Sequence, residues 1–201
     1  MVSFAILSAA AGLRILYSLD LWALRVSQIR TNSTFDLIGE VFSRLGSVEV
    51  TVSGFGVLLI WLFLTNKRTL SIRLAAAMLI TGLVELAMKL WLPQVPMPEE
   101  ASRTEGFSPV VDVPYSYPYP SGHLLRSMIL FGAIYLLWTN KIARVLIIVA
   151  LTGMSLSRVY LGVHWASDVI GGVLLGLAGL VWAFGKQSAI SNQLSAKSRQ
   201  Q

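Results

Sequence analysis

The chain has 201 residues, of which 55% are hydrophobic and only 13% are charged. A soluble domain of this length exposes more charge, and the mean hydropathy of +0.67 also favours an integral membrane protein. The absence of cysteine excludes disulfides, thiolate metal sites and cysteine nucleophiles. The net charge of +6 does not indicate a nucleic-acid partner, because the basic residues are scattered among apolar runs, where membrane orientation and anionic lipid account for them.

Six apolar segments are each close to the roughly 20 residues that an α-helix needs to cross a bilayer. They cover residues 2–18, 48–65, 74–92, 121–138, 144–160 and 166–185. The first is the weakest, since it is short and carries Arg14, whose charge costs about 2.5–3.5 kcal/mol at mid-membrane unless it snorkels. No charged segment precedes it, so we expect a helix there rather than a signal peptide. The predicted fold is therefore an all-α bundle of six membrane-spanning helices.

Residues 19–46 follow a different pattern, that of an amphipathic helix. Apolar residues recur at helical spacing with charged residues between them, at Phe35, Ile38, Phe42 and Leu45. Ser33 is the predicted N-cap and Gly46 the predicted end of this helix. We expect it to lie in the membrane interface rather than to span the bilayer.

Basic residues in the short loops predict the orientation in the membrane. They follow the second and fourth segments and recur in the tail, at Lys67, Arg68, Arg73, Lys141, Arg144, Lys186, Lys197 and Arg199. Because cytoplasmic loops are rich in Lys and Arg, both termini are expected in the cytoplasm, and the 93–120 loop and the 157–168 turn outside, on a plasma membrane. Three arginines in residues 19–46 favour the opposite orientation, although an interfacial helix can carry them.

One domain is expected over residues 1–201, with a core at about 35–185 and a short cytoplasmic tail at 186–201. Small residues spaced for close helix packing occur in the last segment, at Gly172, Gly176 and Gly179. The 93–120 loop is long and rich in proline and aromatic residues, including Pro109, Pro114, Phe107 and Tyr115. A loop of this length in a small protein indicates a binding loop or lid.

His164 and Asp168 are four residues apart at the start of the last segment, so their side chains share one helical face. A carboxylate that accepts a hydrogen bond from one imidazole nitrogen leaves the other nitrogen able to attack an electrophile. A purely structural His–Asp pair that caps the helix is the alternative explanation.

Pro120-Ser121-Gly122-His123 opens the fourth segment. Ser121 can cap the helix, Gly122 allows the backbone to approach a ligand, and free N–H groups at a helix N-terminus bind anions. His123 would then lie beside the anion, where it can transfer a proton. The alternative is an ordinary helix start.

Fixed cations accompany the two histidines. Lys89 and Arg158 lie at the outer ends of two further segments, where they can bind phosphate oxygens or merely snorkel. Glu85, one turn before Lys89, is expected to neutralise it. Two histidines and an aspartate can also hold zinc or iron, but Lys89, Arg126 and Arg158 would repel a divalent ion and stabilise a phosphoryl group. We therefore expect neither a metal nor another cofactor.

These motifs resemble those of the type 2 phosphatidic acid phosphatase superfamily, whose membrane members are six-helix lipid phosphatases. The family's second motif, Pro-Ser-Gly-His, is complete at residues 120–123. The third, Ser-Arg-(five residues)-His-(three residues)-Asp, is complete at residues 157–168 and is highly specific, because it fixes four residue types at set spacing. The resemblance covers nearly the whole chain from about residue 35.

The chain departs from the family's first motif, Lys-(six residues)-Arg-Pro. Counting from Lys89, the expected Arg-Pro positions hold Pro96 and Met97. Arg126, one helical turn beyond His123, and Arg103 in the loop are the candidate replacements for the missing arginine. The departure leaves room for a divergent substrate or an impaired enzyme.

The resemblance implies residue roles that the sequence pattern alone does not assign. His164 would attack phosphorus and form a phosphohistidine, and Asp168 would orient it. His123 would protonate the departing alcohol and then help to activate water. Residues implied to hold the phosphoryl oxygens are Lys89, Ser121, Gly122 and Arg158.

The expected function is a metal-independent lipid phosphatase at the outer membrane face. Phosphatidic acid, phosphatidylglycerol phosphate and a polyprenyl diphosphate all fit, and a phosphotransferase is a variant of the same chemistry. The alternatives from other classes are a phospholipid-binding transporter or flippase and an inactive scaffold. The sequence indicates membrane lipids as partners and does not indicate which oligomeric state the protein adopts.

Overall fold

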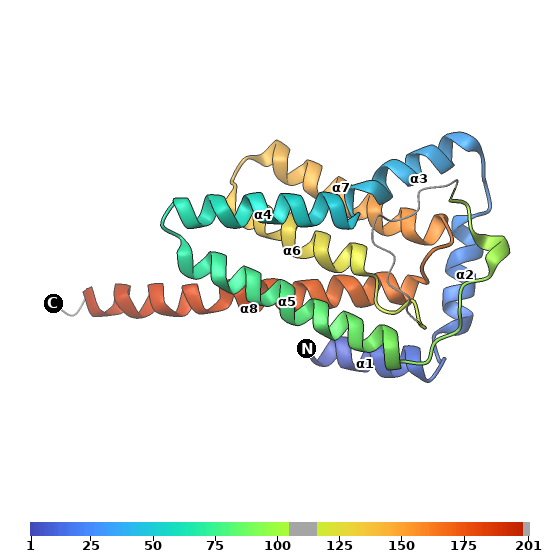
Figure 1. The fold of residues 1–201 in the computed structure, drawn as a ribbon, viewed down its shortest axis with the longest axis horizontal. Coiled ribbons are helices and arrows are strands. Elements are labelled where there is room, and N and C mark those ends of the chain that lie inside the picture. The colour runs from blue at the N-terminus through green and yellow to red at the C-terminus, as the bar shows by residue number, and fades with distance from the viewer. Residues whose placement is uncertain (105–115, 199–201) are drawn as a thin grey trace.

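The computed structural model describes residues 1–104 and 116–198, with side chains described up to residue 185. Within these ranges the secondary structure is helical and contains no strand, which confirms the all-α class. The helices are α1 (Val2–Gly12), α2 (Tyr17–Ser27), α3 (Ser33–Leu45), α4 (Val48–Leu64), α5 (Arg68–Trp91), η1 (Glu99–Ala101), α6 (Gly122–Leu137), α7 (Lys141–Tyr160) and α8 (Ala166–Ser198) (Figure 1).

Helix α6 lies inside the bundle and packs against α4, α5, α7 and α8. Its contact with α8 depends on the glycines of α8, whose spacing predicted close helix packing. A Cβ atom on Gly176 would lie 2.7 Å from Cβ of Met128 and 2.8 Å from the carbonyl oxygen of Leu125. Gly172 and Gly179 also face neighbouring helices at close range. Small residues therefore let the backbones of α6 and α8 approach each other.

Four helical stretches in the described part of the chain are long and apolar enough to cross a membrane: Ser33–Leu64, Arg68–Trp91, Lys141–Tyr160 and Ala166–Gly185. The pair α1 and α2 would make a fifth span if it counts as one bent element, and α6 is a shorter apolar helix. The predicted number of six spans is therefore not confirmed.

The first predicted span, residues 2–18, is wrong as a continuous helix. Helix α1 ends at Gly12, and α2 begins at Tyr17 with its axis bent by 91°. Arg14 lies in the turn between them with a φ of 60°. At a rise of 1.5 Å per residue, α1 is only about 16 Å long, shorter than the roughly 30 Å of a bilayer core. It packs along α8, while α2 crosses over to contact α7 and α8.

The amphipathic helix at residues 33–45 is present as α3, but its N-cap is Asn32 rather than Ser33. The side-chain oxygen of Asn32 accepts a hydrogen bond of 2.9 Å from the N–H of Phe35. Helix α3 packs against α7. Together with α4 it forms the stretch Ser33–Leu64, which is long and apolar enough to cross a membrane, so the interfacial position of α3 stays a prediction. At the other end of the chain, the predicted tail at 186–201 is largely a continuation of α8, which runs to Ser198.

Four helix ends that carry the sequence motifs meet at one end of the bundle. The C-terminal ends of α5 and α7 and the N-terminal ends of α6 and α8 lie together on the right in Figure 1. The basic connections between α4 and α5 and between α6 and α7 lie at the opposite end. The bundle thus gathers the motif residues at one end.

Substitution of Gly176 by alanine should destabilise the bundle, because the added methyl group would collide with α6. We expect a loss of about 1–3 kcal/mol and a Tm lower by about 2–10 °C in detergent. Gly82→Ala in α5 is the matched control, because nothing lies within 4 Å of the position where its Cβ would be. An equal Tm for the two variants would contradict the close α6–α8 packing.

Candidate active site

The paired side chains of His164 and Asp168 form the centre of the site. Nδ1 of His164 lies 3.2 Å from Oδ2 of Asp168, and both side chains are buried. Asp168 is in the first turn of α8, and its Oδ2 also accepts the N–H of Trp165 at 2.9 Å. A carboxylate in this position reaches back to the residue that precedes the helix, as in a capping box. The same group therefore starts α8 and orients the histidine.

The Arg158 carbonyl fixes the spacing within the third motif. It accepts the N–H groups of Val163 at 3.3 Å and of His164 at 3.2 Å. Gly162, between Arg158 and Val163, has a φ of 66°, which is the left-handed region that glycine adopts without strain. This turn returns the chain from α7 to α8 and brings Arg158 and His164 to the same end of the bundle.

The Pro-Ser-Gly-His motif lies directly against α8. The N–H of Ser121 donates to the carbonyl of Asp168 at 2.9 Å, which ties the start of α6 to the carboxylate residue. Ser121 occupies the N-cap position, but its side chain makes no cap hydrogen bond, contrary to the sequence prediction. Its Oγ is buried and has no hydrogen-bond partner among the described residues. No hydrogen bond to the described residues would thus have to break for this hydroxyl to bind a ligand at the helix start.

Glu85 joins two of the predicted cations. Its carboxylate lies 3.4 Å from Nζ of Lys89 and 3.4 Å from Nη1 of Arg126. It also lies directly against Gly122, where any side chain would collide with it. A carboxylate thus rests beside the start of α6, at the place where an anion is favoured.

Arg158 and His123 are the remaining predicted site residues. Nη1 of Arg158 donates to Oγ of Ser43 on α3 at 2.7 Å. His123 lies next to Gly46, whose Cβ would be 3.2 Å from Cδ2 of the ring. Helix α3 and the α3–α4 connection therefore cover the site from one side.

The electrostatic environment keeps His164 uncharged. Burial lowers the pKa of His164 well below its ordinary value, and the positive charges of Arg158, Lys89 and Arg126 lower it further. These cations are thus close enough to act on the imidazole. Because the neutral ring has an unshared electron pair on one nitrogen, it has the form that a nucleophile requires.

Arg103 is held away from this group by other partners. It forms two hydrogen bonds with the carboxylate of Asp36, at 2.8 and 2.9 Å, and Tyr160 donates to the same carboxylate at 2.7 Å. The backbone N–H of Arg103 also donates to the carbonyl of Leu161. Of the two candidate replacements for the first-motif arginine, Arg126 is therefore beside Lys89, whereas Arg103 anchors the loop to α3 and α7.

The loop after α5 is anchored on both sides of the segment at 105–115, which lies outside the described residues together with Phe107, Pro109, Pro114 and Tyr115. The N–H of Tyr117 donates to the carbonyl of Lys89. Tyr119 is fully buried, and its hydroxyl lies 2.9 Å from Oγ of Ser8. Burial raises the pKa of Tyr119 to about 12, so this residue is an uncharged anchor.

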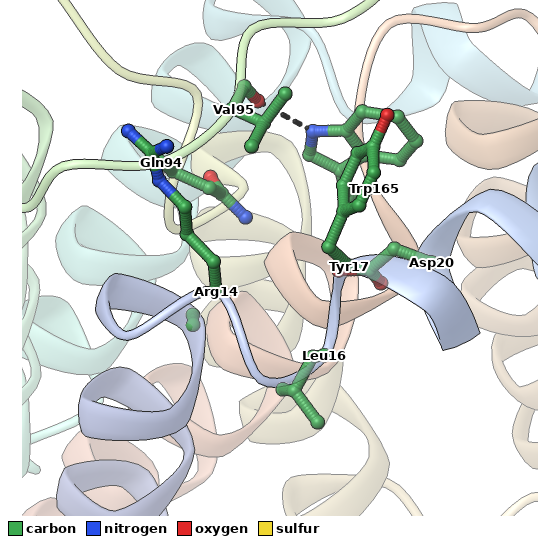
Figure 2. A pocket seen from close by; sticks show the side chains of 8 residues that line it. Arg14, Leu16, Tyr17, Asp20, Gln94, Val95 and Trp165 are labelled. Atoms are coloured by element: carbon green, nitrogen blue, oxygen red, sulfur yellow. Dashed lines mark hydrogen bonds between the residues drawn. The ribbon is translucent and has the colours of Figure 1, made fainter.

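Figure 2 shows the side chains that line a small cavity, among them Arg14, Asp20, Gln94, Val95 and Trp165. The indole N–H of Trp165 donates to the carbonyl of Val95 at 2.8 Å. The cavity volume of about 10 Å³ is no larger than the space for one water molecule. It is therefore too small to hold a substrate group.

No three His, Cys, Asp or Glu side chains come together as a possible metal site among the described residues.

Three polar residues that touch the site were not found from the sequence: Ser43, Gln94 and Asp20. Gln94 donates to Asp168, and Asp20 accepts from Ser167. None of the three belongs to a recognisable motif, so the sequence carried no signal for them.

Comparisons with known proteins show the family of this chain. The sequence pattern of the PAP2 superfamily matches residues 70–190. An undecaprenyl-diphosphatase of Sulfolobus acidocaldarius is 50% identical over 64 residues, 31% of this chain and 30% of that protein. The protein YbjG of Escherichia coli, which is provisionally named an undecaprenyl-diphosphatase, is 31% identical over 137 residues, 67% of this chain and 66% of that protein. Both matches span less than two thirds of the relative's own length.

Solved structures share the fold. A PAP2-type phosphatidylglycerolphosphate phosphatase of Bacillus subtilis superimposes with a TM-score of 0.75 over 94% of each chain at 22% identity. LpxE of Aquifex aeolicus gives a TM-score of 0.59 over 83% of this chain and 95% of that chain at 20% identity. Fold and site together define a membrane-embedded helical bundle with a histidine–carboxylate pair among clustered cations. The chain belongs to the PAP2 superfamily, as its second and third motifs indicated.

The charge state of His164 can be measured directly, because the chain has only two histidines. In protein labelled with ¹⁵N-histidine, the ring shifts of His164 should stay those of a neutral imidazole from about pH 7.5 to about pH 6, because the lowered pKa keeps the ring deprotonated above it. The His123→Gln variant assigns the two sets of signals. A His164 titration centred near pH 6.5, the usual value, would contradict the buried, cation-rich environment.

Proposed function

We propose that this protein is a metal-independent lipid phosphatase that hydrolyses a phosphate monoester or diphosphate at the membrane surface. The observation that carries the proposal is the His164–Asp168 pair beside Lys89, Arg126 and Arg158. A lipid-binding protein without catalysis would benefit from the cations, but it would have no need of an oriented, neutral histidine.

The phosphoryl group would be held at the start of α6. Lys89, Arg126 and Arg158 supply positive charge, and the Ser121 hydroxyl and the N–H groups near Gly122 supply hydrogen bonds. Lys89 and Arg126 already lie on either side of the Glu85 carboxylate. Cations fixed in this way need little rearrangement as negative charge develops in the transition state.

The reaction would proceed in two steps through a phosphohistidine. With Nδ1–H facing Asp168, the unshared pair on Nε2 of His164 attacks phosphorus, and the bond from phosphorus to the leaving oxygen breaks. His123, whose protonated form is favoured by the negative charge of the bound phosphate, gives its proton to that oxygen. A water molecule then attacks the phosphohistidine and passes a proton to His123, so that inorganic phosphate leaves and both histidines return to their starting state.

Among the three substrate classes, the sequence relatives favour a polyprenyl diphosphate. The 64-residue match at 50% identity is to an undecaprenyl-diphosphatase, and the longer match carries a name of the same kind. Phosphatidic acid and phosphatidylglycerol phosphate offer the same terminal phosphate on an apolar anchor. A family variant that transfers the phosphoryl group to another lipid would replace water by an alcohol in the second step.

The location proposed for this activity is the outer face of a plasma membrane, with both termini in the cytoplasm. Basic residues lie at the end of the bundle opposite the site, in the α4–α5 and α6–α7 connections. The positive-inside rule assigns that end to the cytoplasm.

The test is phosphate release from a panel of lipid phosphates and diphosphates, with and without EDTA. The wild type should release phosphate in both conditions, and His164→Ala should lower kcat by at least about 1000-fold because the nucleophile is lost. Activity that survives in the variant, or that the chelator abolishes, would refute this mechanism. Release from none of the lipids would favour the transporter or scaffold alternatives.

Arg126 should replace the arginine that the first motif lacks. Arg126→Ala should lower kcat/KM by about 100-fold, the usual cost of removing one group that stabilises transition-state charge. Arg103→Ala, which removes an arginine engaged by Asp36, is the matched control and should have a much smaller effect. Near-normal turnover of Arg126→Ala would exclude this role, and the reverse order of the two effects would assign it to Arg103.

A further inference from the structure

Gln94, in the loop after α5, contacts the carboxylate that orients His164. Its Nε2 donates to Oδ1 of Asp168 at 2.7 Å and to Oγ of Ser167 at 3.3 Å. Asp168 Oδ2 faces His164 and Trp165, so Gln94 occupies the other carboxylate oxygen. All the polar groups involved are buried, with Gln94 only 7% exposed.

The orientation of the Gln94 amide follows from its surroundings. The reverse orientation would place Oε1 against the ionised Asp168 carboxylate, where two acceptors would repel each other. The NH₂ group must therefore face Asp168, and Oε1 is left buried with no protein partner among the described residues.

Asp20 on α2 fixes the other side of the amide. Oδ1 of Asp20 accepts the N–H of Ser167 at 2.8 Å, and its Oδ2 accepts the hydroxyl of Ser167 at 2.7 Å. An ionised carboxylate only accepts, so the Ser167 proton points to Asp20 and the Ser167 oxygen is free to accept from Gln94. The hydrogen bonds thus run in one direction, from Gln94 to Ser167 and from Ser167 to Asp20.

We infer that Gln94 and Asp20 are positioning residues that hold the Asp168 carboxylate in the rotamer that orients His164. The inference rests on the proposed function for its catalytic meaning, although the geometry can be tested without activity. Asp20 lies outside the family match at residues 70–190, so a helix that precedes the matched segment completes the site. Gln94 lies between Lys89 and the position where the first motif is incomplete.

Replacement of Gln94 by methionine removes both hydrogen bonds and nearly preserves the volume. Asp168 should then turn more freely, and kcat should fall by about 10–100-fold, while KM changes by less than about threefold, because the phosphate ligands are untouched. Asp20→Asn should cause a smaller loss, and the double variant Asp20→Asn/Gln94→Met should be no worse than Gln94→Met alone, because the two residues act in series.

Gln28→Met is the matched control. Gln28 also donates two hydrogen bonds from Nε2, at 2.8 Å to the Ala101 carbonyl and at 2.7 Å to the Tyr160 carbonyl, but it does not contact the His164–Asp168 pair. Its loss should lower the Tm by an amount similar to that of Gln94→Met. A merely structural role for Gln94 would give the two variants the same catalytic consequences.

The decisive measurements are a double-mutant cycle and the ¹⁵N spectrum of the His164 ring. If Gln94 acts through Asp168, Gln94→Met should lower kcat by less than about threefold in an Asp168→Asn background. In the spectrum, Gln94→Met should shift the His164 ring signals and change the ratio of its tautomers, whereas Gln28→Met should leave them unchanged. The Tm of each variant shows that it is folded.

Three results would overturn the inference: a kcat of Gln94→Met within threefold of the wild type, an equal loss in both backgrounds, or unchanged His164 signals. The spectrum also separates this inference from the proposed function. A wild-type protein that releases no phosphate from any lipid would refute the lipid phosphatase, while the His164 signals would still report whether Gln94 positions the pair.

Discussion

A carboxylate enclosed in an apolar bundle is the constraint on which the site depends. Asp168 is fully buried, and an ionised carboxylate is stable in such a place only when its oxygens accept hydrogen bonds. The partners come from two separate segments: the turn before α8, with the N–H of Trp165 and the ring of His164, and the loop after α5, with Gln94. The loop after α5 and the turn before α8 must therefore adopt their observed positions together.

The cations obey a related rule. Charges within a membrane bundle are costly unless they are paired or face one another in the interior. Lys89 and Arg126 share the Glu85 carboxylate, and Arg103 is paired with Asp36. The two pairings also separate two tasks, since the first gathers positive charge beside the start of α6 and the second fixes the loop to α3 and α7.

Much of the site was predictable because its chemistry is concentrated in short motifs. The i, i+4 spacing predicted that His164 and Asp168 would pair, although His164 lies in the turn before α8 and not on a shared helical face. The small-residue spacing predicted close packing of α8 against another helix. The break after Gly12 was not predictable from hydropathy, because apolar residues continue on both sides of Arg14 and a single charge can also lie within a span by snorkelling. Gln94 and Asp20 were missed for a similar reason, since each contributes through a partner more than 70 positions away. Asn32, rather than the adjacent Ser33, is the N-cap, a difference that local sequence preference does not resolve.

The position of the Glu85 carboxylate has a consequence for the proposed turnover. A phosphate that reaches Lys89 and Arg126 does not enter a vacant positive field, because it exchanges with an anion that belongs to the protein. Its net attraction is therefore the difference between two anions, which is smaller than the cations alone would give. In the proposed reaction the same exchange would operate in reverse after the chemical step, when Glu85 would reclaim its two partners and help inorganic phosphate to depart. An anion built into the chain in this way favours rapid release over tight retention of the product.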